Sequence, residues 1–211
     1  NLTHNNNLDT LICSSNSLGN LDLSNNPSLS YLKAIDCSIS SLSLASDSII
    51  TYFNLKNNQL SVIDLSNFVN TTYCNLQNNQ LTSIDASNCI SIEYLLLSNN
   101  DLYTLNFKNG NNTVVGSGWN GVFNSTGNSN LQCIEVDDPS FSSTSSAWYK
   151  DSWSSYSDNC SLAGCTDQLA CNYNSLAWID DGSCLTVYGC MDLLACNYDV
   201  SATCDDGSCL T

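Results

Sequence analysis

Cysteine is the residue type whose spacing in this sequence offers the clearest chemistry. The chain holds 13 cysteines in 211 residues, and two late segments, GCTDQLACNYNSLAWIDDGSC (164–184) and GCMDLLACNYDVSATCDDGSC (189–209), place their shared cysteines 25 residues apart. Units this short bury too little apolar surface to hold themselves together, so covalent or metal staples are expected. Such cysteine use predicts an oxidising compartment.

The pairing of these cysteines is only partly restricted by their positions. The second segment has four cysteines and therefore allows three pairings. Because the first and last cysteines occur in both segments, they are expected to bond to each other. The resulting prediction is Cys165–Cys184, Cys190–Cys209 and Cys196–Cys204. Ile179 replaces the counterpart of Cys204 in the first segment, so Cys171 is either free or bonded outside its own segment.

Carboxylates crowd the same two segments around the turn sequence DDGS, and no basic residue follows Lys150. Ca²⁺ prefers such oxygen ligands, so a calcium site is one hypothesis. The alternative is that these residues only support tight turns through Asx and Gly chemistry. Their spacing is not that of an EF-hand. The candidate ligands are Asp167, Asp180, Asp181, Asp192, Asp205 and Asp206.

The rest of the composition excludes several classes of function. Four Lys, no Arg and 20 Asp or Glu give a formal net charge of −16, which disfavours nucleic acid and anionic lipid as partners. The single histidine, His4, has no nucleophile beside it in the sequence, so we predict that the protein is not an enzyme. No apolar run has the length of a transmembrane segment.

A 21-residue period organises the first half of the chain. Five copies of the pattern LxxLxLxxNxLxxLxL begin at Leu8, Leu29, Ile50, Thr71 and Ile92. One copy cannot bury its own apolar stripe, but stacked copies share a continuous core and place their short strands in parallel. The pattern resembles the leucine-rich repeat family. The predicted fold is therefore mainly β: a leucine-rich-repeat solenoid with short parallel strands, followed by two small disulfide-rich modules.

The repeat places equivalent residues in columns. The Asn of the pattern is expected to bond backbone groups where the chain leaves the sheet. In the return segments, Asp22, Asp64 and Asp85 share a column that either caps turns or holds a row of cations. One outward column of the strands consists of Tyr31, Tyr52, Tyr73 and Tyr94. Tyrosine suits contact with a protein or glycan partner, and the alternative is a ladder that only stabilises the sheet.

A cap is expected at about 109–160, where the period fails. Leu131, Cys133 and Ile134 are predicted to form the last strand, with Trp148, Trp153 and Tyr156 over the open end. The motifs CIEVDDP and SDNC resemble the C-terminal cap of secreted bacterial leucine-rich-repeat proteins, and this resemblance implies a Cys133–Cys160 disulfide. The predicted domains are the solenoid with its cap (1–160), a first module (161–186) and a second module (187–211).

The two modules resemble the GCTD…ACNY…DDGSC module that occurs in tandem in extracellular bacterial proteins. The resemblance implies an extracellular or cell-surface location on a Gram-negative bacterium, as cargo of type IX secretion. Leu185–Thr186 after the first module recurs as Leu210–Thr211, so a third module or a sorting domain is expected to follow. Asp47-Ser48-Ile49 resembles an O-glycosylation site of such bacteria, which makes Ser48 a candidate.

Two functions are consistent with these features. The first is a non-enzymatic adhesion-type module that binds protein or glycan through the solenoid face, with the disulfide-stapled modules as spacers. The second is a structural subunit that self-assembles into an extracellular fibre or matrix.

Overall fold

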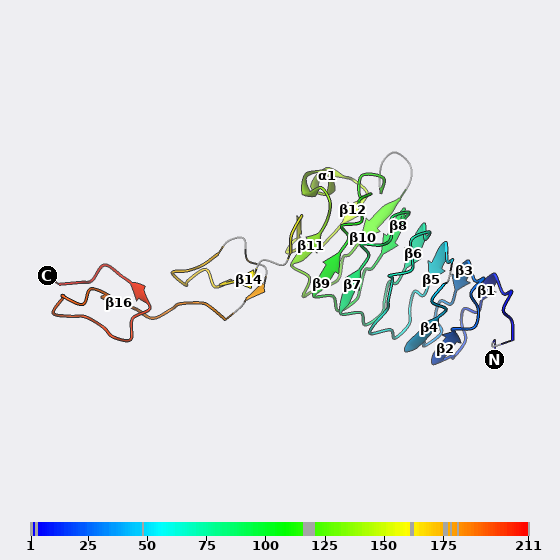
Figure 1. Ribbon diagram of the computed structural model, residues 1–211, viewed down its shortest axis with the longest axis horizontal. Coiled ribbons are helices and arrows are strands. Elements are labelled where there is room, and N and C mark those ends of the chain that lie inside the picture. The colour runs from blue at the N-terminus through cyan, green and yellow to red at the C-terminus, as the bar shows by residue number, and fades with distance from the viewer. Residues whose placement is uncertain are drawn as a thin grey trace. The chain divides into compact units, whose positions relative to one another are not determined.

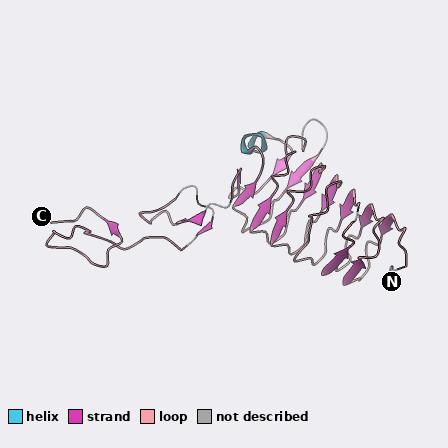
Figure 2. Ribbon diagram, in the orientation of Figure 1, coloured by secondary structure: helices cyan, strands magenta, loops and turns pink. Residues whose placement is uncertain are grey.

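The protein consists of two compact units, Asn1–Asp158 and Asn159–Thr211. The computed structural model describes residues 2, 4–47, 49–115, 121–160, 163–174, 177, 179–180 and 182–210. The first unit is a solenoid of short parallel strands in two layers, with one short helix among its described residues (Figures 1 and 2). The predicted fold class is therefore confirmed for this unit.

One strand from each repeat enters a seven-stranded parallel sheet, the first layer. The register follows the 21-residue period: Tyr31 pairs with Tyr52, and Leu32 pairs with Phe53. Alternate residues of a strand face opposite sides, so each strand sends its middle residue into the core. In order across the sheet, the strands are β1 (Thr10–Ile12), β3 (Tyr31–Lys33), β5 (Tyr52–Asn54), β6 (Tyr73–Asn75), β8 (Tyr94–Leu96), β10 (Val122–Asn124) and β12 (Trp148–Tyr149).

The return segments form the second layer. It contains a pair, β2 (Asn20–Leu23) and β4 (Ser41–Leu44), and a four-stranded sheet in the order β13 (Ser155–Ser157), β11 (Cys133–Glu135), β9 (Thr104–Asn106) and β7 (Ser83–Asp85). Residues 61–65 of the third repeat form no strand, so the layer is interrupted there. A cleft of about 310 Å³ opens at this point, between Leu42 and Leu44 on one side and Val62 and Ile63 on the other.

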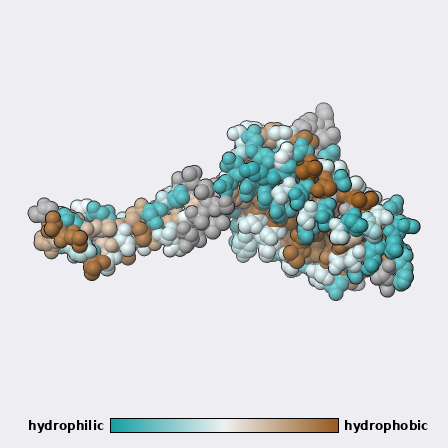
Figure 3. Space-filling view, in the orientation of Figure 1, coloured by the Kyte–Doolittle hydropathy of each residue, from teal (hydrophilic) through white to brown (hydrophobic). Residues whose placement is uncertain are grey.

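The apolar core fills the space between the two layers. Leu32, Phe53 and Leu95 are fully buried, and Cys74 is 1% exposed, so the inward column is continuous from repeat to repeat. Burial of each such side chain contributes about 1.5–3 kcal/mol, which favours stacking over separate repeats. On the outside, hydrophobic residues form small groups among hydrophilic ones (Figure 3).

The C-terminal end of the solenoid differs from the prediction. Cys133–Glu135 lies in the second layer, where Ile134 pairs with Leu105, and it is not the last strand because β12 and β13 follow it. Trp148 is itself part of the last strand of the first layer and pairs with Phe123. The cap therefore adds two further strands to each layer. Trp153 is 52% exposed, so it does not close the core.

Inserted residues explain why the 21-residue period fails after Phe107. Phe123 pairs with Leu95, a step of 28 residues, because the segment after Phe107 is longer than in the repeats.

Two local features hold the C-terminal end of the solenoid in place. The short helix α1 (Pro139–Thr144) begins after Asp138, whose carboxylate accepts hydrogen bonds from two backbone N–H groups. Between the layers, the indole N–H of Trp148 donates to the Val115 carbonyl at 2.8 Å.

The second unit contains two segments that repeat the same contacts. Each has a two-stranded parallel pair, β14 (Ala163–Gly164) with β15 (Ile179–Asp180), and β16 (Tyr188–Gly189) with β17 (Cys204–Asp205). Each is closed by a disulfide that the sequence favours, Cys165–Cys184 or Cys190–Cys209. We call residues 163–186 the first module and residues 187–210 the second module.

The predicted Cys196–Cys204 disulfide is wrong. Cys204 bonds to Cys171 of the first module, across a Cα–Cα distance of 6.0 Å, and Cys196 is an exposed free thiol. Of the two alternatives for Cys171, the structure therefore has the bond outside its own module. The sequence favoured a bond within one module because it shows only spacing, whereas pairing depends on which sulfur atoms the fold brings together.

Candidate functional site

The predicted tyrosine column forms a stacked ladder on the solenoid. Tyr31, Tyr52, Tyr73 and Tyr94 lie side by side on four neighbouring strands of the first layer. Ring centroids are 4.2 Å apart for Tyr31 and Tyr52 and 4.5 Å apart for Tyr52 and Tyr73, with the planes within 5° of parallel. Tyr94 is tilted by 40° from Tyr73. All four rings are partly exposed.

The tyrosine ladder covers the outward-facing residues that lie two positions later on the same strands. Asn54 and Asn75 are only 5% exposed, although their positions face away from the core. Each amide donates to the hydroxyl of the tyrosine two residues earlier at 3.3 Å, and its oxygen accepts the backbone N–H two residues later. The tyrosines therefore stabilise the sheet as well as forming a surface. Burial raises the pKa of Tyr73, so its hydroxyl stays protonated at neutral pH.

Apolar side chains extend this surface beyond the tyrosines. Leu96 lies on β8, the strand of Tyr94, and Val122 lies on β10, the next strand. Both are partly exposed, and Ile12 on the first strand is 63% exposed. Tyr149, on the last strand, is 49% exposed. The only cation among the strand residues of this face is Lys33. We call this face, from β1 to β12, the tyrosine face.

A second ladder, which the sequence reasoning missed, runs along the turns after these strands. The side-chain amide of Asn57 donates to Asp36, that of Asn78 to Asn57 and that of Asn99 to Asn78, at 2.5–2.8 Å. All four residues have φ between 54° and 58°, a conformation that Asn and Asp tolerate well. The signal was present in the sequence as the recurring Asn-Asn pair at 57–58, 78–79 and 99–100.

The return column of acids caps turns. The carboxylates of Asp22, Asp64 and Asp85 each accept the backbone N–H of the serine two residues later, at 2.8–3.0 Å. Hydrogen bonds from Ser24 and Ser66 lower the pKa of Asp22 and Asp64. The capping alternative is thus confirmed.

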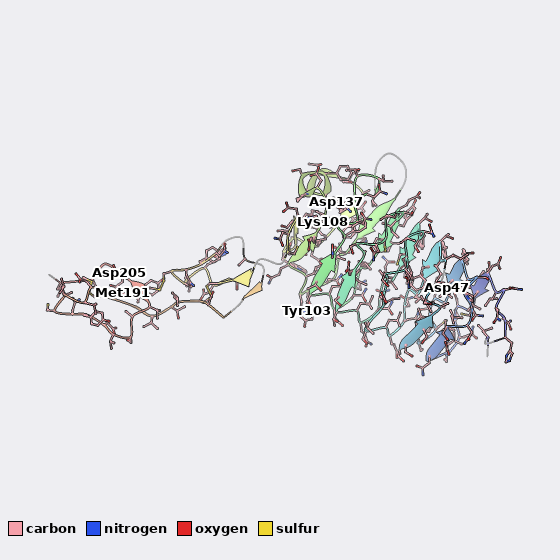
Figure 4. The ribbon with its side chains drawn as sticks, viewed as in Figure 1. Asp47, Tyr103, Lys108, Asp137, Met191 and Asp205 are labelled. Carbon is pink, nitrogen blue, oxygen red and sulfur yellow. A yellow bond between two sulfur atoms is a disulfide. The ribbon has the colours of Figure 1, made fainter. Side chains whose placement is uncertain are left out.

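The acidic residues of the modules make the same kind of turn. Asp167 and Asp192 each accept the backbone N–H of the leucine two residues later at 2.9 Å, and Asp205 and Asp206 accept those of Gly207 and Ser208. Figure 4 shows Asp205 in the second module. Within the described part of the chain, no three His, Cys, Asp or Glu side chains are grouped to hold a metal ion. The side chain of Asp180 and all of Asp181 lie outside it, and the calcium site stays a prediction.

Three further predictions concern the cap cysteines, the glycosylation candidate and a transmembrane segment. Cys133 and Cys160 are both disulfide-bonded. Ser48, the candidate for glycosylation, lies outside the described residues. No helix in the described ranges is long and apolar enough to cross a bilayer.

Comparisons with known proteins give a similarity in structure. No protein-family model and no curated protein matches the chain. The chain is similar to the functional domain of InlJ from Listeria monocytogenes, described as including a cysteine ladder, with 20% identity and a TM-score of 0.39. The similarity covers 72% of this chain and 46% of that one, so the chain spans less than half of that structure.

Proposed function

We propose that the protein is a non-enzymatic, extracellular, adhesion-type module that binds a protein or glycan through the tyrosine face. The observation that carries this proposal is the row of four partly exposed tyrosine rings on adjacent strands. Disulfides in the second unit support an oxidising, extracellular location. Export from a Gram-negative bacterium by type IX secretion is expected from the resemblance of the modules.

The chemistry of the tyrosine face favours these partners. Stacked rings form a broad aromatic surface whose side chains are already ordered, so binding costs little side-chain entropy. Ring faces and hydroxyls together suit the apolar and polar sides of a sugar, or the side chains of a protein surface. The strongly negative chain disfavours nucleic acid, which needs clustered cations.

The proposal is tested with a double substitution, Tyr52→Ala with Tyr73→Ala, assayed on arrays of immobilised glycans and extracellular-matrix proteins. Wild-type protein is expected to bind a defined subset of the array, and the double variant is expected to lose that binding. The control is Tyr103→Ala, since Tyr103 is 60% exposed and lies next to β9 of the second layer (Figure 4).

A second pair of variants separates recognition from stability. Tyr52→Phe with Tyr73→Phe keeps the stacked rings but removes the hydroxyls that accept from Asn54 and Asn75. It should therefore keep the fold with some loss of stability, while losing hydroxyl contacts with a partner. Retained array binding by the Ala double variant would refute the proposal. Sedimentation of wild-type protein tests the self-assembling fibre: concentration-dependent growth that the Ala variant abolishes would favour the fibre over adhesion.

A further inference from the structure

The two modules of the second unit have nearly the same backbone geometry around one cysteine. In the first module, Cys171 N–H donates to the Leu185 carbonyl, and Asn172 bridges to Ser183 and Leu185. In the second module, Cys196 N–H donates to the Leu210 carbonyl at the same 3.2 Å, and Asn197 bridges to Ser208 and Leu210. Cys196 is therefore held in the position that Cys171 occupies.

Around Cys171 this geometry forms a joint between the modules. Its sulfur is bonded to Cys204 of the second module. The Cys204 sulfur also lies 3.2 Å from the Leu185 carbonyl oxygen. A third contact comes from the second module's Tyr188, whose hydroxyl donates to the Leu169 carbonyl at 2.7 Å. Within the described ranges, the disulfide, these two contacts and a longer one of 3.9 Å between the Cys171 sulfur and the Thr203 carbonyl oxygen join the modules.

Around Cys196 the equivalent thiol and backbone carbonyls are present, but no described cysteine or tyrosine contacts them as Cys204 and Tyr188 contact the first module. The Cys196 thiol is free and exposed, and it lies 3.6 Å from the Leu210 carbonyl oxygen. Leu194 is the equivalent of Leu169, and no group within the described ranges donates to its carbonyl. The Cys171–Cys204 bond joins the second cysteine of one module to a cysteine 33 residues later, in the next module. The equivalent partner of Cys196 would therefore lie in a module that follows it.

We propose that Cys196, with the carbonyls of Leu194 and Leu210, is the open half of an inter-module disulfide joint. Its occupant is a further module of the same kind that carries a cysteine at the position of Cys204. The first module has Ile179 at that position, so its Cys171 can bond to the next module but no earlier module can bond to it in this way. The second module has both cysteines: Cys204 for the preceding module and Cys196 for the following one. The modules then form a chain in which each is bonded to the next.

The bond forms by thiol–disulfide exchange with a small disulfide such as oxidised glutathione. The Cys196 thiolate attacks that disulfide, forming a mixed disulfide and releasing one glutathione thiolate. The thiolate of the incoming module then attacks the Cys196 sulfur, and the second glutathione leaves. Two protein thiols are oxidised, and one oxidised glutathione is reduced to two glutathione molecules.

The test extends the full chain by a second copy of residues 187–211, placed after Thr211 and refolded with a glutathione redox buffer. Mass mapping of unreduced peptides is expected to find Cys196 bonded to the copy of Cys204. Alkylation should then be lost at Cys196 and appear at the copy of Cys196. The matched control carries Ile at the copy of Cys204, as the first module does at Ile179, and should leave Cys196 alkylated.

Two results would overturn the proposal. One is a bond between the two middle cysteines of the appended copy, with Cys196 still alkylated. The other is a Cys196–Cys196 bond between two extended chains in place of the joint. Array binding by the tyrosine face does not enter this readout, so failure of the joint and failure of the proposed function are distinguishable.

Discussion

At the scale of single residues, buried asparagines join one repeat to the next. Asn58 is 8% exposed, and its side-chain amide donates to the carbonyls of Ala34 and Leu55 at 2.8–2.9 Å. Its oxygen accepts the backbone N–H groups of Cys37 and Ile39. With a further bond to the Lys56 carbonyl at 3.3 Å, this one side chain has five backbone partners, from its own repeat and the preceding one. The predicted backbone role of the repeat asparagine is confirmed.

Replacement of Asn58 by alanine should therefore lower the free energy of unfolding strongly. Several buried backbone groups lose their partner, at about 1–3 kcal/mol each, so a total loss of about 3–5 kcal/mol is expected. Urea unfolding followed by circular dichroism measures it. Gln59→Ala is the control, because Gln59 is exposed and adjacent. Equal losses in the two variants would show that the hydrogen bonds of Asn58 contribute little.

The free cysteines should differ sharply in reactivity. Burial raises the pKa of Cys13 to about 11 and that of Cys89 to about 12, so both stay as thiols near neutral pH. The thiolate is the reactive form, and Cys196 alone among the free cysteines is exposed. In folded protein at pH 8, iodoacetamide should label Cys196 and spare Cys13, Cys37, Cys74 and Cys89. Mass spectrometry locates the label, and rapid labelling at Cys74 or Cys89 would contradict the burial of these two thiols.

At the scale of the elements, each repeat turns after its strand through a residue with positive φ. In the cap, Gly127 follows β10 and takes the place that Asn57, Asn78 and Asn99 hold in the repeats, with φ of 75°. A Cβ at this position would collide with the side-chain oxygen of Asn99. The positive φ favours glycine or asparagine at this turn, and the close approach of the Asn99 side chain leaves room only for glycine.

Substitution of Gly127 by alanine tests this requirement. The positive φ costs about 1–2 kcal/mol for alanine, and the collision with Asn99 adds to that cost. Gly110→Ala is the matched control, since Gly110 has φ of 77° but open space around its Cβ position. Thermal unfolding should show a larger loss for Gly127→Ala, and identical losses would indicate that Asn99 moves aside without cost.

At the scale of the whole molecule, the two units are stabilised by different means. The solenoid has a continuous core of buried apolar residues from Leu23 to Trp148. In the second unit, the buried apolar residues within the described ranges are Cys165, Ala170, Cys190, Ala195 and Cys204. Three disulfides connect that unit, and they supply what so small a core does not.

Reduction should therefore unfold the second unit before the solenoid. With dithiothreitol, chymotrypsin is expected to cleave rapidly at Tyr173, Tyr188 and Tyr198, which are already 40–48% exposed. The solenoid should keep its far-ultraviolet circular dichroism because its core does not depend on those bonds. Trypsin is uninformative here, since no basic residue follows Lys150. Simultaneous loss of both units would contradict this division.

The sequence alone determined the solenoid and its columns, because a 21-residue period leaves one way to bury every inward residue. It therefore placed Leu32 and Phe53 in the core, the tyrosines on one face and the repeat asparagines at the turns. Only the tertiary structure decided the contacts between residues that lie in different segments of the chain. They include the stacking of the tyrosines over Asn54 and Asn75, the position of Trp148 within the first layer, and the bond of Cys171 to Cys204. Spacing along the chain limits which residues can meet, but which of them do meet depends on the distances between segments in the folded protein.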